Sequence, residues 1–150
     1  MQKYTVNPGN LATLQLETFD LQLPAAGEVR VAVRAVGLNF ADIFAIWGLY
    51  KAAPKSVFTP GLEYAGVVEA LGAGVTGLRV GQKVMGVTRF GGYASHLNSD
   101  ARYVLPLPEN WDYATGAAYP VQTLTAYYGM KNLGGLQQGM TVLIHSAVGG

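Results

Sequence analysis

The chain has 150 residues, of which 50% are hydrophobic and 13% are charged, and its formal net charge is +1 at pH 7. This balance allows a sizeable core and excludes an intrinsically disordered chain. Lysine and arginine form no cluster, so nothing indicates a nucleic-acid partner. No apolar run reaches the roughly 18 residues of a membrane span, the first residues lack the apolar stretch of a signal peptide, and cysteine is absent. These features predict a cytoplasmic protein without disulfides, thiolate metal sites or a membrane span.

Residues 1–110 are predicted to be rich in β-structure. Short apolar runs alternate with glycine and proline, which is typical of a small, strongly curved sheet or a partial barrel. The expected strands cover residues 28–36, 64–71, 80–88, 92–97 and 103–105. One helix is expected at residues 39–48, where Asn39 can cap its start and Gly48 can end it.

The pattern after residue 110 predicts helices. Asp112 is a good cap for a helix over residues 113–118, and Pro120 breaks that helix. Residues 121–132 predict a second helix, which the glycine pair at 134–135 closes.

The last ten residues predict a buried parallel strand followed by a nucleotide-binding turn. A continuous apolar run over 141–147 leads to a small residue and then to two glycines. These residues are Ala147, Gly149 and Gly150. Glycines at such a turn let the backbone approach a pyrophosphate. We therefore predict an α+β chain, with a β-rich domain at 1–110 and the incomplete start of a dinucleotide-binding α/β domain at 111–150.

Four stretches of the chain carry a family resemblance through their order and spacing. They are Val36-Gly-Leu-Asn-Phe-Ala-Asp42 with Gly48-Leu-Tyr50, Pro60-Gly-Leu-Glu-Tyr-Ala-Gly-Val-Val-Glu69, Thr123-Leu-Thr-Ala-Tyr127, and Val142-Leu-Ile-His-Ser-Ala-Val-Gly-Gly150. Together they resemble the medium-chain dehydrogenase/reductase superfamily, and in particular its quinone oxidoreductase branch. The resemblance implies a GroES-like catalytic domain followed by a Rossmann domain, with NADPH bound between them. It also implies that most of the Rossmann domain lies outside this sequence.

The chain departs from the zinc-dependent members of that superfamily. Asn39 stands where they have cysteine, and Leu62 stands where they have histidine. A catalytic zinc needs three nitrogen, sulfur or carboxylate ligands, and the only imidazoles here are His96 and His145. We therefore expect no metal site. We expect His145, within an apolar strand, to be a hydrogen-bonded core residue.

Without zinc, the chemistry suits an acceptor that delocalises its own developing charge. In quinones and enones, hydride adds to the β-carbon and hydrogen-bond donors stabilise the negative carbonyl oxygen. The resemblance suggests Tyr50 as the catalytic donor at the substrate, because its phenol is protonated at pH 7. The alternative for Tyr50 is an exposed aromatic residue without a catalytic role.

The resemblance also suggests the residues that bind the cofactor. Asn39 and Thr125 match family residues near the nicotinamide, and Ala147, Gly149 and Gly150 match the pyrophosphate turn. Asn39 can equally act as a helix cap, and Thr125 can equally be a packing residue.

Other residues near these positions are expected to have structural roles. Asp42 is expected to fix the Asn39 turn by accepting N–H bonds, and Glu63 to form a local salt bridge or a backbone bond. Helical spacing favours a core position for the aromatic residues Phe44, Trp47, Tyr127 and Tyr128, although they can also line an apolar cleft.

The function predicted from these observations is NADPH-dependent, zinc-independent reduction of quinones or enones. An enoyl-thioester reductase, including the type found in polyketide synthases, is an alternative within the same superfamily. A non-catalytic binding protein similar to VAT-1 is an alternative from another class. The resemblance further implies that the whole protein forms a homodimer through its Rossmann domain.

Overall fold

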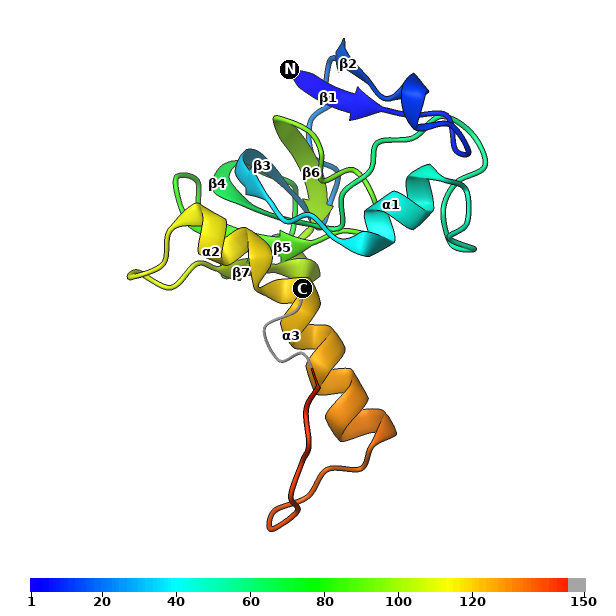
Figure 1. Ribbon diagram of the computed structural model, residues 1–150. Coiled ribbons are helices and arrows are strands. Elements are labelled where there is room, and N and C mark those ends of the chain that lie inside the picture. Colours follow the sequence, from blue (N-terminus) through cyan, green and yellow to red (C-terminus); the bar gives the residue numbers. More distant parts are fainter. Residues whose placement is uncertain (146–150) are drawn as a thin grey trace.

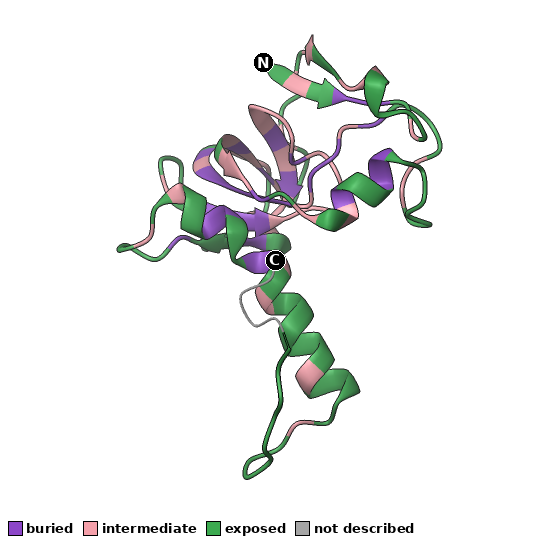
Figure 2. Ribbon diagram, in the orientation of Figure 1, coloured by how far each residue is buried: buried purple, intermediate pink, exposed green. Residues whose placement is uncertain are grey.

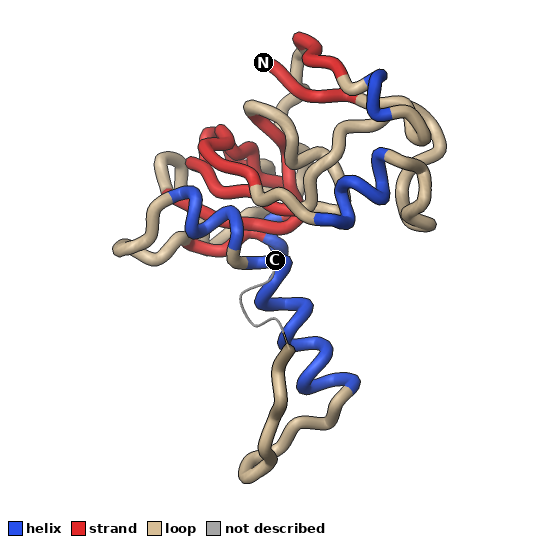
Figure 3. Tube along the Cα trace, in the orientation of Figure 1, coloured by secondary structure: helices blue, strands red, loops and turns tan. Residues whose placement is uncertain are grey.

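The computed structural model describes residues 1–145 and contains two antiparallel sheets with helices at their ends (Figure 1). The elements are β1 (Gln2–Thr5), η1 (Leu11–Thr13), β2 (Gln15–Thr18), β3 (Glu28–Val36), α1 (Phe40–Ile46), β4 (Glu63–Leu71), β5 (Lys83–Val87), β6 (His96–Asp100), η2 (Ala101–Tyr103), β7 (Val104–Pro106), α2 (Tyr113–Ala118), α3 (Pro120–Tyr127) and the π-helical turn η3 (Tyr128–Leu133). Strands β1 and β2 form a pair, and the larger sheet has the order β6-β3-β4-β5-β7. The strands gather in one body, from which α3 projects (Figure 3).

The core of the larger sheet forms where β3 and β4 pair at its centre. Alternation places Val29 and Val31 on the buried face of β3, where they pack against Tyr64 and Val68 of β4. The β3–β4 register shifts between Arg30 and Val31 and again between Val33 and Ala35. Such irregularities increase the local twist and bend of a sheet. The predicted curved, β-rich architecture is therefore confirmed.

Most predicted strands agree with the structure, but two begin late: the strand expected at 80–88 is β5, which starts at Lys83, and the strand expected at 92–97 is β6. β6 starts at His96, because the residues before it pair with β1. Tyr4 N–H donates to Tyr93 O at 2.9 Å, and Ser95 N–H donates to Gln2 O at 2.7 Å. The sequence had not predicted β1 or β2, which have only four residues each.

Helix α1 follows β3 and packs its inner face on a second small core. Ala45 and Ile46 are buried with Val6 and Phe58. Asn39 occupies the N-cap position, and Gly48, at φ 72°, lies in the left-handed region just beyond the end of the helix. Both predicted helix ends are thereby confirmed.

The predicted helices after residue 110 are present, but the chain there is mostly exposed. Asp112 caps α2 by accepting the Thr115 N–H at 2.7 Å, and Ala117 of α2 packs against the sheet. The second helix starts one residue earlier than predicted, at Pro120, and continues as η3. Proline suits this first helical position, because its missing N–H would have no partner there. Figure 2 shows that α3 and the segment after it are largely exposed.

The predicted strand at 141–147 is not formed in its described part. Residues 141–145 have no regular secondary structure, Leu143 is 81% exposed, and His145 is exposed rather than in a core. A parallel strand needs neighbouring strands on both sides, and no strand of residues 1–145 pairs with this segment. Ala147, Gly149 and Gly150 lie outside the described residues. The domain boundary at 110/111 stays a prediction.

Candidate functional site

Asn39 is held at the start of α1 by two carboxylates. Its backbone N–H donates to Asp42 Oδ2 at 2.9 Å, and its side-chain Nδ2 donates to Glu63 Oε1, also at 2.9 Å. The side-chain amide that the sequence suggested as a helix cap is therefore engaged by β4. The predicted role of Asp42, which accepts an N–H bond and fixes this turn, is confirmed.

Glu63 joins the Asn39 turn to the beginning of α3. Its side chain is almost fully buried, with 1% exposed, and its second oxygen, Oε2, accepts the Val121 N–H at 2.8 Å. Val121 follows Pro120 in the first turn of α3, where backbone N–H groups lack partners within the helix. The partial positive charge of a helix N-terminus favours a carboxylate at this place. Of the two roles expected for Glu63, the backbone bond is the one observed.

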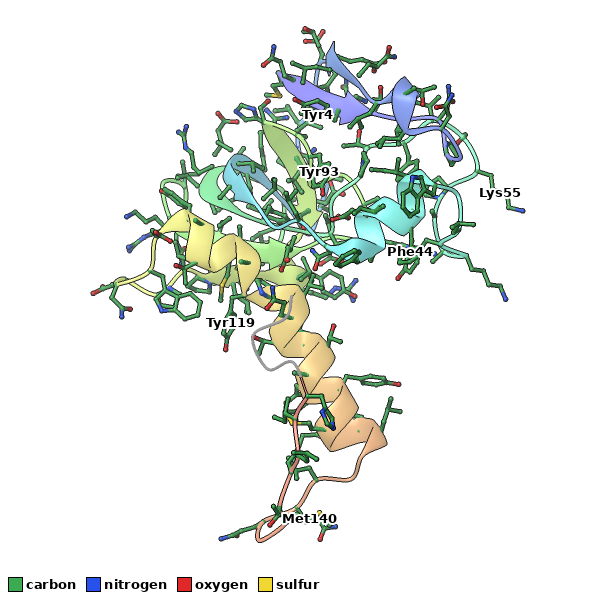
Figure 4. The ribbon with its side chains drawn as sticks, in the orientation of Figure 1. Tyr4, Phe44, Lys55, Tyr93, Tyr119 and Met140 are labelled. Atoms are coloured by element: carbon green, nitrogen blue, oxygen red, sulfur yellow. The ribbon has the colours of Figure 1, made fainter. Side chains whose placement is uncertain are left out.

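Asp42 and Tyr93 form a hydrogen-bonded pair beside Asn39, in which Asp42 is buried and Tyr93 is half-buried. The Tyr93 hydroxyl donates to Asp42 Oδ2 at 2.9 Å, and Asp42 is only 2% exposed. Burial raises the pKa of the Asp42 carboxyl above its ordinary 3.8, although the hydrogen bonds that it accepts oppose this rise. Burial, and then the neighbouring Asp42 charge, raise the pKa of Tyr93, so its phenol stays protonated and donates. Figure 4 shows Tyr93 between the sheet and α1.

Tyr50 lies beyond the opposite end of α1 from Asn39. Its N–H bonds to Phe44 O at 3.1 Å, and its ring packs edge-on against Phe90, with the ring centroids 6.4 Å apart. The side chain is 40% exposed. Seven helical residues separate the two ends of α1, a length of about 10 Å. The structure thus brings Asn39 to α3 but keeps Tyr50 apart from them.

An exposed apolar face runs along α1 between these two positions. Its residues follow helical spacing, and they are Phe40, Ile43, Phe44 and Trp47. Phe44 and Trp47 pack edge-to-face, with centroids 6.1 Å apart. In Figure 4, Phe44 lies on the lower side of α1, the side from which α3 leaves the body. The expectation of a core position for these aromatic residues is wrong in this structure, and the same holds for Tyr127 and Tyr128.

Thr125 is exposed on α3, about one turn beyond Val121. It therefore lies on the helix whose start Glu63 ties to Asn39. The remaining predicted cofactor residues, Ala147, Gly149 and Gly150, cannot be placed, because they lie outside the described residues.

The two histidines do not join this site. His96 Nε2 lies 3.7 Å from Glu69 Oε1, and His145 is exposed in the segment after η3. Within residues 1–145, no three histidine, cysteine, aspartate or glutamate side chains gather as a metal site would require. No helix in the same range is long and apolar enough to cross a membrane.

Sequence reasoning missed two members of the site, Tyr93 and the Val121 N–H. Tyr93 lies within the strand that was expected at 92–97, and a strand pattern does not show which distant residue a tyrosine hydroxyl reaches. A backbone N–H has no side-chain signature, although Pro120 just before it marks a helix start.

The buried Asp42 makes stability depend on pH. Its pKa is raised in the folded state, so its contribution is fully present below the unfolded value and is lost as pH rises through the folded value. We expect Asp42→Asn, which cannot ionise, to gain stability relative to the native protein as pH rises from about 4 to about 7. Urea unfolding of both proteins across this range measures the difference. A difference that stays constant, or that shrinks with rising pH, would contradict the assignment.

The chain is similar to short segments of polyketide synthases. It is 41% identical over 143 residues to a mycocerosic acid synthase-like polyketide synthase of Mycobacterium tuberculosis, covering 95% of this chain and 7% of that protein. It is 42% identical over 150 residues to the pikromycin polyketide synthase component PikAII of Streptomyces venezuelae, covering 100% of this chain and 4% of that protein. The chain thus spans only a small part of these relatives.

Solved structures share the fold. Human synaptic vesicle membrane protein VAT-1 homolog-like protein superposes with a TM-score of 0.89 at 33% identity, over 98% of this chain and 48% of that one. CurK enoyl reductase superposes with a TM-score of 0.85 at 31% identity, over 92% of this chain and 44% of that one. Escherichia coli quinone oxidoreductase complexed with NADPH superposes with a TM-score of 0.82 at 30% identity, over 89% of this chain and 41% of that one. The chain spans less than half the length of each of these structures.

The family of alcohol dehydrogenase GroES-like domains matches residues 25–109, more than half of the chain. This range contains β3 to β7, α1 and the Asn39–Glu63 contact. The chain therefore belongs to the alcohol dehydrogenase GroES-like family, within the medium-chain dehydrogenase/reductase superfamily.

Proposed function

We propose that the full-length protein, meaning this chain with any further sequence that the natural protein carries, reduces quinones or enones with NADPH and without zinc. The proposal depends chiefly on one observation: Glu63 accepts hydrogen bonds from Asn39 and from the start of α3, beside the exposed apolar face of α1. The structural neighbours that include a quinone oxidoreductase with NADPH and an enoyl reductase support the same reaction class.

The described residues suit one side of a nicotinamide site. NADPH, when bound, supplies the hydride. Asn39 offers a fixed amide, and the exposed Thr125 offers a hydroxyl on the adjoining helix. Both groups are able to hydrogen-bond a carboxamide, which carries a donor and an acceptor. In the proposed assignment Ala147, Gly149 and Gly150 approach the pyrophosphate.

The donor set beside Asn39 explains why the proposal excludes zinc. The groups that converge there are an amide, two carboxylates that already accept hydrogen bonds, and a phenol. Structural and catalytic zinc sites use imidazole, thiolate or carboxylate ligands in a set of at least three. An acceptor that delocalises negative charge onto its own oxygen does not require a Lewis acid; a positioned donor stabilises that oxygen.

The apolar face of α1 gives the substrate a place to lie. A flat quinone or enone buries apolar area against aromatic rings such as Phe44 and Trp47. In this arrangement the substrate lies between Asn39, at the cofactor end, and Tyr50, at the far end. The Tyr50 hydroxyl donates to the carbonyl oxygen as charge develops on it. The homodimer and the cytoplasmic location also remain predictions.

Tyr50→Phe tests the donor, because it removes one hydroxyl and keeps the ring. We expect kcat on a quinone or an enone to fall by roughly 10–100-fold, the effect of one lost transition-state hydrogen bond of about 1–3 kcal/mol. The NADPH dissociation constant should change little. Stopped-flow or steady-state NADPH consumption by the full-length protein measures both.

Tyr103→Phe is the matched control, since Tyr103 is exposed and lies in η2, far along the chain from α1. It should leave turnover unchanged. Unchanged turnover in Tyr50→Phe would remove Tyr50 from the mechanism. The absence of any NADPH-dependent turnover in the native protein, on quinone, enone and enoyl thioester alike, would favour a non-catalytic binding role instead.

An enoyl-thioester substrate is a second candidate, favoured by the charge of the loop after α1. Residues 43–62 contain Lys51 and Lys55 and no carboxylate, and both lysines are exposed. Arg89 Nη2 donates to Ala52 O at 3.4 Å, which adds a third cation to this loop. Figure 4 shows Lys55 pointing away from the body. Cations near Tyr50 suit a substrate whose carrier bears phosphate.

The triple variant Lys51→Ala, Lys55→Ala, Arg89→Ala separates the two candidates. For an enoyl-coenzyme A substrate we expect KM to rise roughly tenfold, because three exposed charges each contribute up to about 0.5 kcal/mol. For the matching N-acetylcysteamine thioester, which has no phosphate, KM should be unchanged. The double variant Arg34→Ala, Arg79→Ala is the control, because it removes exposed positive charges elsewhere in the chain. Equal effects on both thioesters would count against recognition of the carrier.

A further inference from the structure

Glu63 is a buried carboxylate whose two hydrogen bonds join segments that lie far apart in the chain. Among residues 1–145 it has no ion-pair partner, and its charge is balanced by two donors, the Asn39 amide and the Val121 N–H. Burying an unpaired carboxylate is costly, and an apolar residue of similar size would avoid that cost. The pair of donors therefore points to a role beyond packing.

The surrounding backbone leaves room for this carboxylate. A Cβ placed on Gly37 would collide with Glu63 Oε1 and would lie 2.5 Å from Ala117 O. Gly37 also donates its N–H to Glu63 O at 3.3 Å. The strand end before Asn39 is therefore shaped around the Glu63 side chain, and the position of the carboxylate is fixed on both sides.

A carboxylate fixes the direction of the Asn39 amide. An ionised carboxylate accepts hydrogen bonds and donates none, so the NH2 end of Asn39 must face it. The carbonyl end of the same amide then points the other way. Without Glu63, nothing in this pair of contacts decides which end of the amide faces outward.

We propose that Glu63 is a positioning residue. It sets which edge of the Asn39 amide is presented to the nicotinamide, and it holds that amide at a fixed spacing from α3. This proposal rests on the proposed function, because it assumes that Asn39 faces the cofactor. Glu63 acts through Asn39 and α3 and touches neither substrate nor cofactor.

Glu63→Gln reverses the amide while keeping the shape of the side chain. The Val121 N–H can only donate, so the glutamine carbonyl must serve it. The glutamine NH2 then faces Asn39, whose amide must turn to offer its carbonyl. The outward edge of Asn39 changes from acceptor to donor. We expect the NADPH dissociation constant to rise roughly tenfold, with a small change in melting temperature.

Asn39→Asp with Glu63→Gln restores the pattern by exchanging the two side-chain types. The glutamine NH2 donates to one oxygen of the carboxylate introduced at position 39, and the other oxygen again presents an acceptor outward. Asn39→Asp alone places a second carboxylate next to that of Glu63. The repulsion between them should lower both NADPH affinity and melting temperature. The double variant should recover most of both losses, which is the signature of direct coupling.

The experiment is an NADPH fluorescence titration and a thermal melt of the full-length native protein, the two single variants and the double variant. Glu69→Gln is the control, since Glu69 lies on the same strand, is exposed and is near His96 instead. It should change neither readout. Additive effects of the two substitutions, or native NADPH affinity in Glu63→Gln, would overturn the positioning role. If the native protein itself binds no NADPH, the proposed function fails, and the melting data alone then report whether the two side chains are coupled.

Discussion

The burial of the Glu63 carboxylate is the constraint on which the rest of this site depends. A charged group with 1% exposure needs hydrogen bonds at both oxygens to offset its lost hydration. The chain supplies them from two distant segments, the turn before α1 and the first turn of α3. Gly37 leaves the space, and β4 anchors the backbone that carries the carboxylate. The relative position of α1 and α3 follows from meeting these demands together.

The two ends of α1 are held by different kinds of interaction. Asn39 and Asp42 are held by partly buried hydrogen bonds, which are stronger than bonds fully exposed to water. At the other end of α1 the side chains are exposed. Trp47 and Tyr50 make edge-on ring contacts, with Phe44 and Phe90 respectively. The loop beyond them accepts one long hydrogen bond, from Arg89 to Ala52 O. In the proposed function, the end of α1 that these hydrogen bonds hold faces the cofactor, and the end with the exposed side chains faces the substrate.

Much of the fold could be predicted because local patterns report it directly. The alternation over 28–36 predicted β3 at its observed bounds, and Asp112 predicted the start of α2. Asn39 and Gly48 marked the ends of α1 for the same reason. These signals are local: a cap or a strand period depends on residues close together in the sequence.

The remainder depends on partners that a local pattern does not contain. The apolar run at 141–145 has the composition of a buried strand, but a strand forms only where another strand pairs with it. Phe44 and Trp47 follow core spacing and are nevertheless exposed, because spacing identifies a face without showing what covers it. Tyr93 reaches Asp42 across 51 positions, a separation that no motif records.

A crystal structure of the full-length protein with NADPH tests whether Glu63 positions Asn39 for the cofactor. We expect the nicotinamide to lie against Asn39 and the side of α3 that bears Thr125, while Glu63 still accepts hydrogen bonds from both Asn39 Nδ2 and Val121 N. A nicotinamide bound away from Asn39, or a Glu63 side chain turned from these donors to a bound metal ion, would contradict it.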